Sequence, residues 1–335
     1  MMARSITLSL VILLVMGIEG SAFANPDQWR SEWSRTNFDK SSVPFEEIFS
    51  GGPPKDGIPA IDDPVFAPVS EVTDLADTEP VISVNIGGDW RAYPLQVLMW
   101  HEIVNDTVGG TPVAITFCPL CNSSIVFDRR VDDQILDFGT TGKLRFSDLV
   151  MYDRQTESWW QQFLGEAVVG DMTGKRLKII PNRVESIAKF RERAPAGAKV
   201  LVPSNQRARA YGRNPYAGYD SRDRPYPFFN GELPSEVAPL ARVITIDRSG
   251  SGVREAWALD LLREKGRVET DDGFVITWEP GQNSAMDAGV ISQGVDIGNV
   301  VVQRRESDGT LVDWPYGVDF AFAYKAFFPD QSIKQ

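Results

Sequence analysis

The residues with the most specific chemistry in this sequence are two cysteines and one histidine. Cys118 and Cys121 form a CxxC motif, Cys-Pro-Leu-Cys, and His101, the sole histidine of the chain, precedes it. Thiolates and imidazole bind soft and borderline metal ions such as Cu(I) and Zn(II), and a thiolate is also the nucleophile of thiol–disulfide exchange. A single histidine excludes multi-histidine metal sites, and it excludes a Ser-His-Asp triad that does not use His101.

The CxxC motif is compatible with three kinds of site. In a thioredoxin-like fold the motif lies at the start of a helix, but Asn-Ser-Ser-Ile-Val-Phe at 122–127 favours a strand. A CxxC between two strands is typical of a metal-binding knuckle, and Asn122 tolerates the positive φ that such a turn requires. In an exported protein the two cysteines can instead form a structural disulfide. Metal binding, thiol chemistry and a structural bridge therefore all stay open.

A predicted hairpin places the histidine beside the motif. If Gly109-Gly110 forms a two-residue turn, Val108 pairs with Thr111. The same register pairs His101 with Cys118, and directly paired residues have Cβ atoms about 4.5–5.5 Å apart. A slip of one residue would place the two side chains on opposite faces of the hairpin.

This register predicts a set of metal ligands. His101, Cys118 and Cys121 would suit Cu(I), or zinc with one open coordination position. Met151 or Asp148 is the expected fourth ligand. The same three residues, Cys118, Cys121 and His101, are the candidates for catalysis if the site is an enzyme centre.

Other chemistry is less well supported. Glu102, Asp106 and Asp128 lie near the motif and are candidate general acids or bases, although solvated or structural roles are more usual for Asp and Glu. No glycine-rich phosphate loop occurs in a strand–helix context, so we expect no nucleotide cofactor. No histidine follows Cys121, so we expect no c-type haem attachment.

The elements that must position these residues are mostly short and β-branched. Many short strands and few long helical patterns predict a β-rich α+β fold, with antiparallel sheets and short helices in one compact domain, possibly in two lobes. Residues 25–54 are expected to form an N-terminal arm, and residues 55–335 the domain. Expected strands are 81–86, 101–105, 112–117, 123–127, 176–180, 243–246, 273–278 and 300–303, and helical character is expected at 94–100 and 184–193.

The N-terminus predicts export. Arg4 precedes a run of apolar residues at 6–18, and Ala22-Phe23-Ala24 fits a signal peptidase site, so residues 1–24 are expected to be cleaved before Asn25. The apolar run is shorter than the roughly 20 residues that span a bilayer, which argues against the alternative of a membrane anchor. No later apolar run is long enough to cross a membrane, so we expect a soluble periplasmic or secreted protein. The net charge of −12 argues against a nucleic-acid partner.

Several motifs resemble the DUF3179 family, a domain of unknown function. They are Gly57-Ile58-Pro59-Ala60-Ile61, Trp-His-Glu-Ile-Val-Asn-Asp at 100–106, Thr-Phe-Cys-Pro-Leu-Cys at 116–121, Leu-Val-Met-Tyr-Asp-Arg at 149–154 and Asn-Pro-Tyr-Ala-Gly-Tyr at 214–219. The resemblance covers about residues 55–330. One departure is Asn122, because the family usually has Gly after the second cysteine. The resemblance implies exported or membrane-associated relatives but no reaction.

Two functions and one structural alternative follow. The first is metal binding, of Cu(I) or zinc, through the Cys-Pro-Leu-Cys knuckle and His101. The second is a thiol–disulfide oxidoreductase or Cys-dependent enzyme, in which His101 lowers the pKa of an exposed thiol. The third is a binding module in which a Cys118–Cys121 disulfide only braces a loop. Tyr216 and Tyr219 are candidates to line a ligand groove, although aromatic residues in such loops more often pack the loop down.

Overall fold

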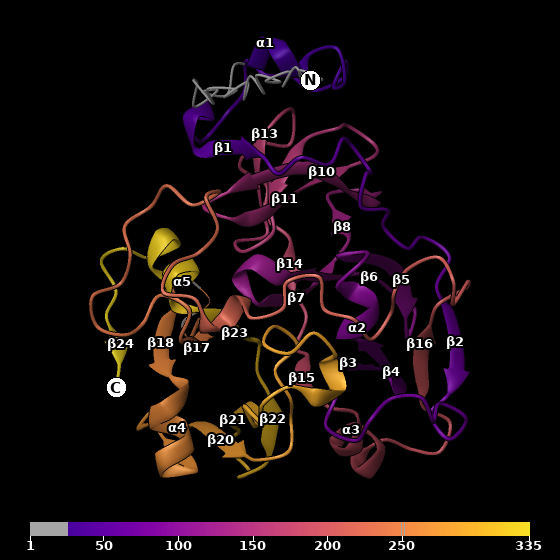
Figure 1. The fold of residues 1–335 in the computed structure, drawn as a ribbon, viewed down its shortest axis with the longest axis vertical. Coiled ribbons are helices and arrows are strands. Elements are labelled where there is room, and N and C mark those ends of the chain that lie inside the picture. Colours follow the sequence, from indigo (N-terminus) through magenta and orange to yellow (C-terminus); the bar gives the residue numbers. More distant parts are fainter. Residues whose placement is uncertain (1–25, 249, 251) are drawn as a thin grey trace, which may run out of the picture.

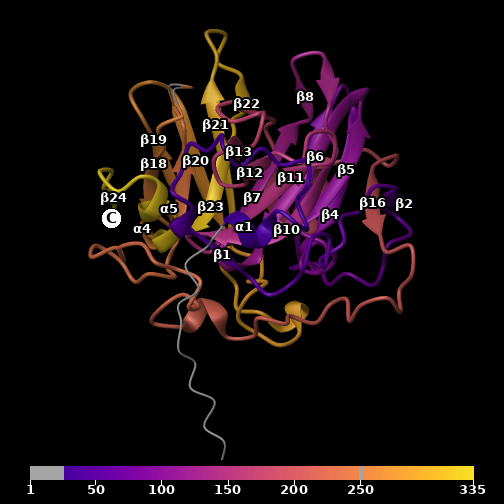
Figure 2. The same cartoon turned by 90° about the horizontal axis from the view of Figure 1, so that it is seen from above.

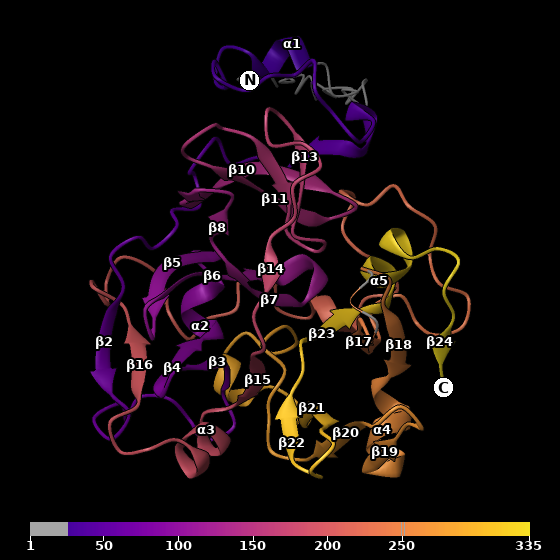
Figure 3. The same ribbon diagram turned by 180° about the vertical axis from the view of Figure 1, so that it is seen from behind.

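Five small β-sheets form most of the molecule. The computed structural model describes residues 26–335 except 249 and 251, so the predicted export signal lies outside the described residues. The sheets are arranged around a common centre in a propeller-like manner (Figures 1 and 3). Within the described part of the chain, strands pair antiparallel except for β4 with β16 and β18 with β24.

The first three sheets come from the N-terminal two thirds of the chain. In spatial order they are β1 (Ile48–Ser50), β10 (Phe138–Arg145), β11 (Asp148–Asp153), β12 (Trp159–Gln161) and β13 (Glu166–Val169); then β14 (Lys178–Ile179), β7 (Ser123–Asp128), β6 (Thr111–Cys118) and β5 (Ile103–Val108); then β15 (Arg183–Ser186), β3 (Pro80–Ile86), β4 (Asp89–Pro94), β16 (Lys199–Val202) and β2 (Val65–Pro68).

The other two sheets come from the C-terminal third. They are β23 (Tyr316–Phe320), β17 (Arg242–Ile246), β18 (Glu255–Ala258) and β24 (Ile333–Lys334), and β19 (Arg267–Glu269), β20 (Phe274–Glu279), β21 (Asn299–Arg305) and β22 (Leu311–Asp313). A small hairpin of β8 (Arg130–Val131) and β9 (Gln134–Ile135) stands apart. The segment at 203–241 between β16 and β17 crosses one face of the propeller, and the β21–β22 hairpin projects from the opposite face (Figure 2).

The helices are short and form no layer of their own. They are α1 (Pro26–Trp29), α2 (Leu95–Leu98), α3 (Ile187–Arg193), α4 (Leu259–Lys265) and α5 (Ala321–Phe327), with 3₁₀ turns η1 (Phe45–Glu47), η2 (Pro119–Cys121), η3 (Tyr219–Ser221) and η4 (Ile291–Gln293). The expectation of a β-rich fold with antiparallel sheets and short helices is confirmed. A propeller-like set of sheets describes it better than an α+β fold in two lobes. None of the described helices is long and apolar enough to cross a membrane.

Most of the expected strands are present. The helix expected at 184–193 is a strand in its first part and a helix in its second. Residues 183–186 form β15, which pairs with β3, and the helix begins only at Ile187. Ser186 ends the strand and caps the helix, because its hydroxyl accepts a hydrogen bond from the backbone N–H of Lys189. The apolar spacing at 184–190 therefore comes from two elements that both face the core.

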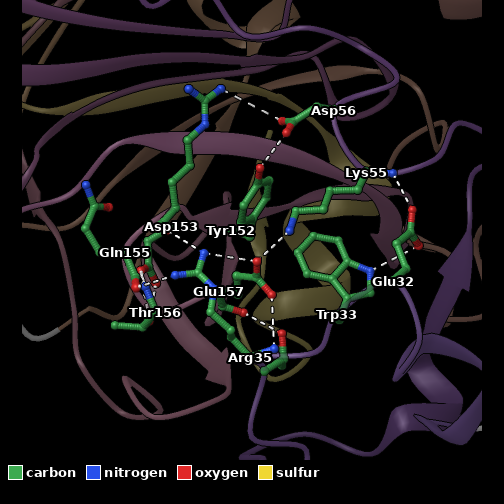
Figure 4. Close-up of polar contacts among 12 residues, drawn as sticks. Glu32, Trp33, Arg35, Lys55, Asp56, Tyr152, Asp153, Gln155, Thr156 and Glu157 are labelled. Carbon is green, nitrogen blue, oxygen red and sulfur yellow. Dashed lines mark hydrogen bonds and ion pairs between the residues drawn. The ribbon is translucent and has the colours of Figure 1, made fainter.

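The segment before the domain packs on the outer face of the β10–β13 sheet. Trp29 and Trp33 are buried there against Trp159, with ring centroids 5.1 and 5.2 Å away. Figure 4 shows the polar part of this contact, in which the carboxylate of Glu157 is paired with Arg35 at 3.0 Å and Lys55 at 2.7 Å. This segment is therefore attached by both aromatic packing and ion pairs.

Candidate metal centre

The two cysteines lie in the tight connection between β6 and β7. Cys118 ends β6 and pairs with Ser123, the first residue of β7, and Cys121 lies in the 3₁₀ turn η2 between them. Asn122 closes the turn in the left-handed conformation with φ 52°, as its sequence position predicted. Its side-chain amide donates to the backbone carbonyl of Val318 on β23 at 2.7 Å, which fixes the turn to the neighbouring sheet.

A carboxylate completes a cluster with the two thiols. The Sγ atoms of Cys118 and Cys121 and a carboxylate oxygen of Asp148 all lie within 4.8 Å of one another, and all three residues are buried. Asp148 begins β11, directly after Phe146 and Ser147, whose φ angles are 53° and 65°. This left-handed turn brings the start of β11 to the knuckle, and the Cys118 thiol contacts the carbonyl of Ser147 at 3.7 Å.

The carboxyl group of Asp148 is only half satisfied. Its Oδ2 accepts hydrogen bonds from the side-chain amide of Gln161 and from the backbone N–H of Phe163, whereas its buried Oδ1 accepts none from an N–H or O–H group of the described residues, and the Cys118 thiol lies close to this carboxyl. Among the described residues, the hydroxyl of the neighbouring Ser147 is also buried without a hydrogen-bond partner. Because buried polar atoms are normally hydrogen-bonded, the free Oδ1 of Asp148 beside two thiols indicates a place for a ligand.

Burial dominates the electrostatics of the cluster. Burial raises the pKa of Asp148 to about 7, although the hydrogen bonds from Phe163 and Gln161 and the nearby Cys118 thiol act in the opposite direction. Burial also raises the pKa of both the Cys118 and the Cys121 thiols, and it raises the pKa of Asp319 to about 6. The two thiols are not joined by a disulfide. The pocket of thiols and carboxyls is therefore one in which anionic charge is costly unless a cation compensates for it.

The predicted hairpin register is confirmed, but His101 is not part of the cluster. Val108 pairs with Thr111, and the pairing continues to Ile103 with Thr116. Glu102, the next residue, has φ 58°, so the chain is not extended as it approaches His101.

The ring of His101 is instead occupied elsewhere. Its Nδ1 lies 2.7 Å from the carbonyl of Pro59 and its Nε2 lies 2.9 Å from the hydroxyl of Tyr211. Burial lowers the pKa of this imidazole, which favours its neutral form. His101 therefore joins the segment at 203–241 to the body.

The second expected fourth ligand, Met151, also lies apart from Asp148. It is fully buried on β11, three residues after Asp148, and pairs with Thr140 and Trp160. Side chains alternate between the faces of a strand, so residues three apart point to opposite faces. Of the two alternatives for the fourth ligand, Asp148 is the one brought to the thiols.

The other charged motif residues have structural partners. Asp106 accepts hydrogen bonds from Arg91 and from Tyr93, and Asp128 accepts from Arg130. Glu102 differs, because its carboxyl group has no hydrogen-bond or ion-pair partner among the described residues. The sequence placed all three near the motif but could not distinguish the unpaired one.

The motif after Met151 holds the domain together rather than forming a second centre. Asp153 accepts hydrogen bonds from the backbone and hydroxyl of Thr156 and from the indole N–H of Trp160. Tyr152 donates its hydroxyl proton to Asp56 (Figure 4). Arg154 forms an ion pair with the same carboxylate at 3.9 Å.

Comparison with known proteins decides the family. A family model described as "Protein of unknown function (DUF3179)" matches residues 55–331. The chain belongs to the DUF3179 family. Searches of curated proteins and of solved structures gave no match. The match of this DUF3179 protein includes Cys118, Cys121 and Asp148, and the family description attaches no activity to them.

Proposed function

We propose that the chain is an exported protein that binds a thiophilic metal ion through Cys118, Cys121 and Asp148. The observation that carries this proposal is the convergence of two thiols and a half-satisfied carboxylate within 4.8 Å in a buried site. A metal ion would use the free Oδ1 of Asp148 and would compensate for the charge of the thiolates. The export part rests on the sequence of residues 1–24.

Zinc fits this ligand set better than Cu(I). Zinc accepts both thiolate sulfur and carboxylate oxygen, whereas Cu(I) favours sulfur ligands. Three protein ligands would leave one position of a tetrahedral zinc ion for water or a substrate, as in catalytic zinc sites. A reactive, exposed thiol is less supported, because Cys118 is 2% exposed and Cys121 is 0% exposed.

The test is metal analysis of the full chain, purified from the periplasm without a histidine tag. We expect about one zinc per chain by mass spectrometry, together with two thiols that react only after unfolding and chelation. Cys118→Ser/Cys121→Ser should abolish metal binding. Asp148→Asn should weaken it at least about 10- to 100-fold in competition with a chromophoric chelator, because losing even a group that only supports a metal ligand has an effect of this size.

The control that separates the two ligand sets is His101→Ala. It removes the histidine but leaves the buried cluster intact, so metal content should not change. Loss of metal in His101→Ala with full retention in Asp148→Asn would overturn the proposed set in favour of the one expected from the hairpin. Metal-free protein with two free thiols would overturn metal binding, and metal-free protein with no free thiols would assign the motif to a disulfide.

A further inference from the structure

A cavity of about 340 Å³ lies next to the candidate metal centre. Leu120, between the two cysteines, and Leu149, next to Asp148, both line it. Further walls come from β10 and from the segment before the domain, through Gly142 and Pro53. The volume is near the lower end of the range for ligand pockets, roughly 300–1,000 Å³, so it suits a small molecule.

Most of the cavity wall is apolar or aromatic. Three aromatic side chains, Tyr216, Tyr226 and Phe228, come from the segment at 203–241 that crosses this face of the propeller (Figure 2). Ile58 and Leu144 add aliphatic surface. Such a wall binds the apolar part of a ligand, and the faces of aromatic rings also attract cations.

Two polar side chains of the wall, those of Thr140 and Lys143, have partners within the protein. Thr140 donates its hydroxyl proton to the carbonyl of Ile58 at 2.7 Å. The ammonium of Lys143 lies 3.5 Å from the carbonyl of Thr141 and 3.7 Å from Glu32, so it is engaged on the side of the N-terminal segment.

Glu102 supplies the carboxyl group of the cavity wall. It is 8% exposed, and no described residue donates a hydrogen bond to its carboxyl group or pairs with it. Its backbone is held at φ 58°, which non-glycine residues seldom adopt, while its carbonyl accepts from the N–H of Phe117 at 2.8 Å. Burial raises the pKa of this carboxyl to about 8, and Asp148 adds to the shift. A buried carboxyl without a partner, on the wall of a cavity, points to a ligand that supplies the partner.

We propose that this cavity binds a small organic cation, an ammonium that carries apolar groups, with Glu102 as its counter-ion. A hard metal ion would need several oxygen ligands, and the wall provides only one free carboxyl. An anionic ligand would meet the carboxyl of Glu102. None of the three proposed metal ligands lines this cavity, so the proposal of cation binding does not depend on zinc binding.

Three probes of similar size but different charge test the proposal: benzylammonium, benzyl alcohol and benzoate. Binding is measured by titration calorimetry and by saturation-transfer NMR with the full chain at pH 8.5, where the Glu102 carboxyl is mostly ionised. We expect benzylammonium to bind about tenfold or more tightly than the other two, because a charge-assisted hydrogen bond to a buried carboxylate contributes that much. Equal or tighter binding of benzyl alcohol or benzoate, or no binding of any of the three, would overturn the proposal.

Three variants locate the site. Glu102→Gln preserves the shape of the side chain but removes its charge. It should weaken the binding of benzylammonium about 10- to 100-fold. Phe228→Leu should also weaken benzylammonium binding, because it removes one aromatic ring from the cavity wall. Glu264→Gln, which removes an exposed carboxylate on α4, is the matched control and should leave binding unchanged.

The double variant Cys118→Ser/Cys121→Ser separates this proposal from the metal site. This variant should bind no metal. After chelator treatment of both proteins, it should bind benzylammonium as tightly as the natural protein. Unchanged affinity in Glu102→Gln would show that the probe binds elsewhere and would refute the assignment, whatever the metal content.

Discussion

Replacing Glu102 with Gln should change how the stability of the protein depends on pH. The carboxyl has a pKa of about 8 in the folded chain, against 4.5 for an ordinary glutamate, because it is buried. The folded state therefore retains a proton between pH 4.5 and 8 that the unfolded state releases. Over this window the group lowers the free energy of unfolding by about 1.4 kcal/mol for each pH unit, and by about 4–5 kcal/mol in total.

Gln is uncharged at all these pH values, so Glu102→Gln removes the effect. At pH 5 the effect of the glutamate on the free energy of unfolding should still be below about 1 kcal/mol, because most of the window between the unfolded and folded pKa values lies above this pH. At pH 8.5 the variant should be more stable by several kcal/mol. The raised pKa values of Asp148 and Asp319 also lower the free energy of unfolding as the pH rises, but they do so in both the variant and the natural protein.

The assay is urea unfolding followed by tryptophan fluorescence at intervals from pH 5 to 9. Only the difference between the two proteins is interpreted, and Glu264→Gln serves as the control for removing one carboxylate from an exposed position. Parallel stability profiles for Glu102→Gln and the natural protein would refute the reasoning, since they would mean that the carboxyl titrates normally and is not desolvated.

Three further changes test individual parts of the fold. Asn122→Ala should cost about 1–3 kcal/mol in urea unfolding, from the left-handed backbone and the lost bond to β23, whereas Asn122→Gly should cost only about 1; equal losses would contradict the role of backbone strain. Gly142→Ala should cost about 3 kcal/mol or more in thermal unfolding, because a Cβ there would lie 1.9 Å from the carbonyl oxygen of Pro53, and a near-natural midpoint would be incompatible with this packing. Glu157→Gln should weaken attachment of residues 26–54 by about 1 kcal/mol, seen as about fivefold faster proteolysis of that segment, since Glu157 holds Arg35; an unchanged rate would assign the attachment to aromatic packing alone.

The local features of the candidate site were accessible from sequence, and its long-range partners were not. The turn at Gly109-Gly110 sets the hairpin register, and Asn122 has the conformation that its residue type favours. Extrapolating the hairpin to His101 failed because the left-handed conformation of Glu102 interrupts the extended chain, and nothing in the residue type of a glutamate predicts this.

The arrangement of the sheets was the less predictable part. Alternating apolar residues identify strands but do not say which distant strands share a sheet, and here β1 pairs with β10, far along the chain. Asp148 could be considered as a ligand from sequence but not preferred over Met151, because the alternation of faces matters only once the strand is placed beside the knuckle. Glu102 was indistinguishable from Asp106 until the arginine that pairs with Asp106 was located.

The bond between Asn122 and Val318 has a consequence for the order in which the molecule assembles. The β6–β7 hairpin that carries both cysteines closes over four residues, so it can form within microseconds. Its neighbour β23 lies 196 residues further along the chain and must wait for that length of chain to be available and ordered. During this interval the thiols are accessible to oxidants and to metal ions, and afterwards they are buried. We therefore expect the chemical state of Cys118 and Cys121 to be decided while the chain is still folding and then preserved by the completed structure.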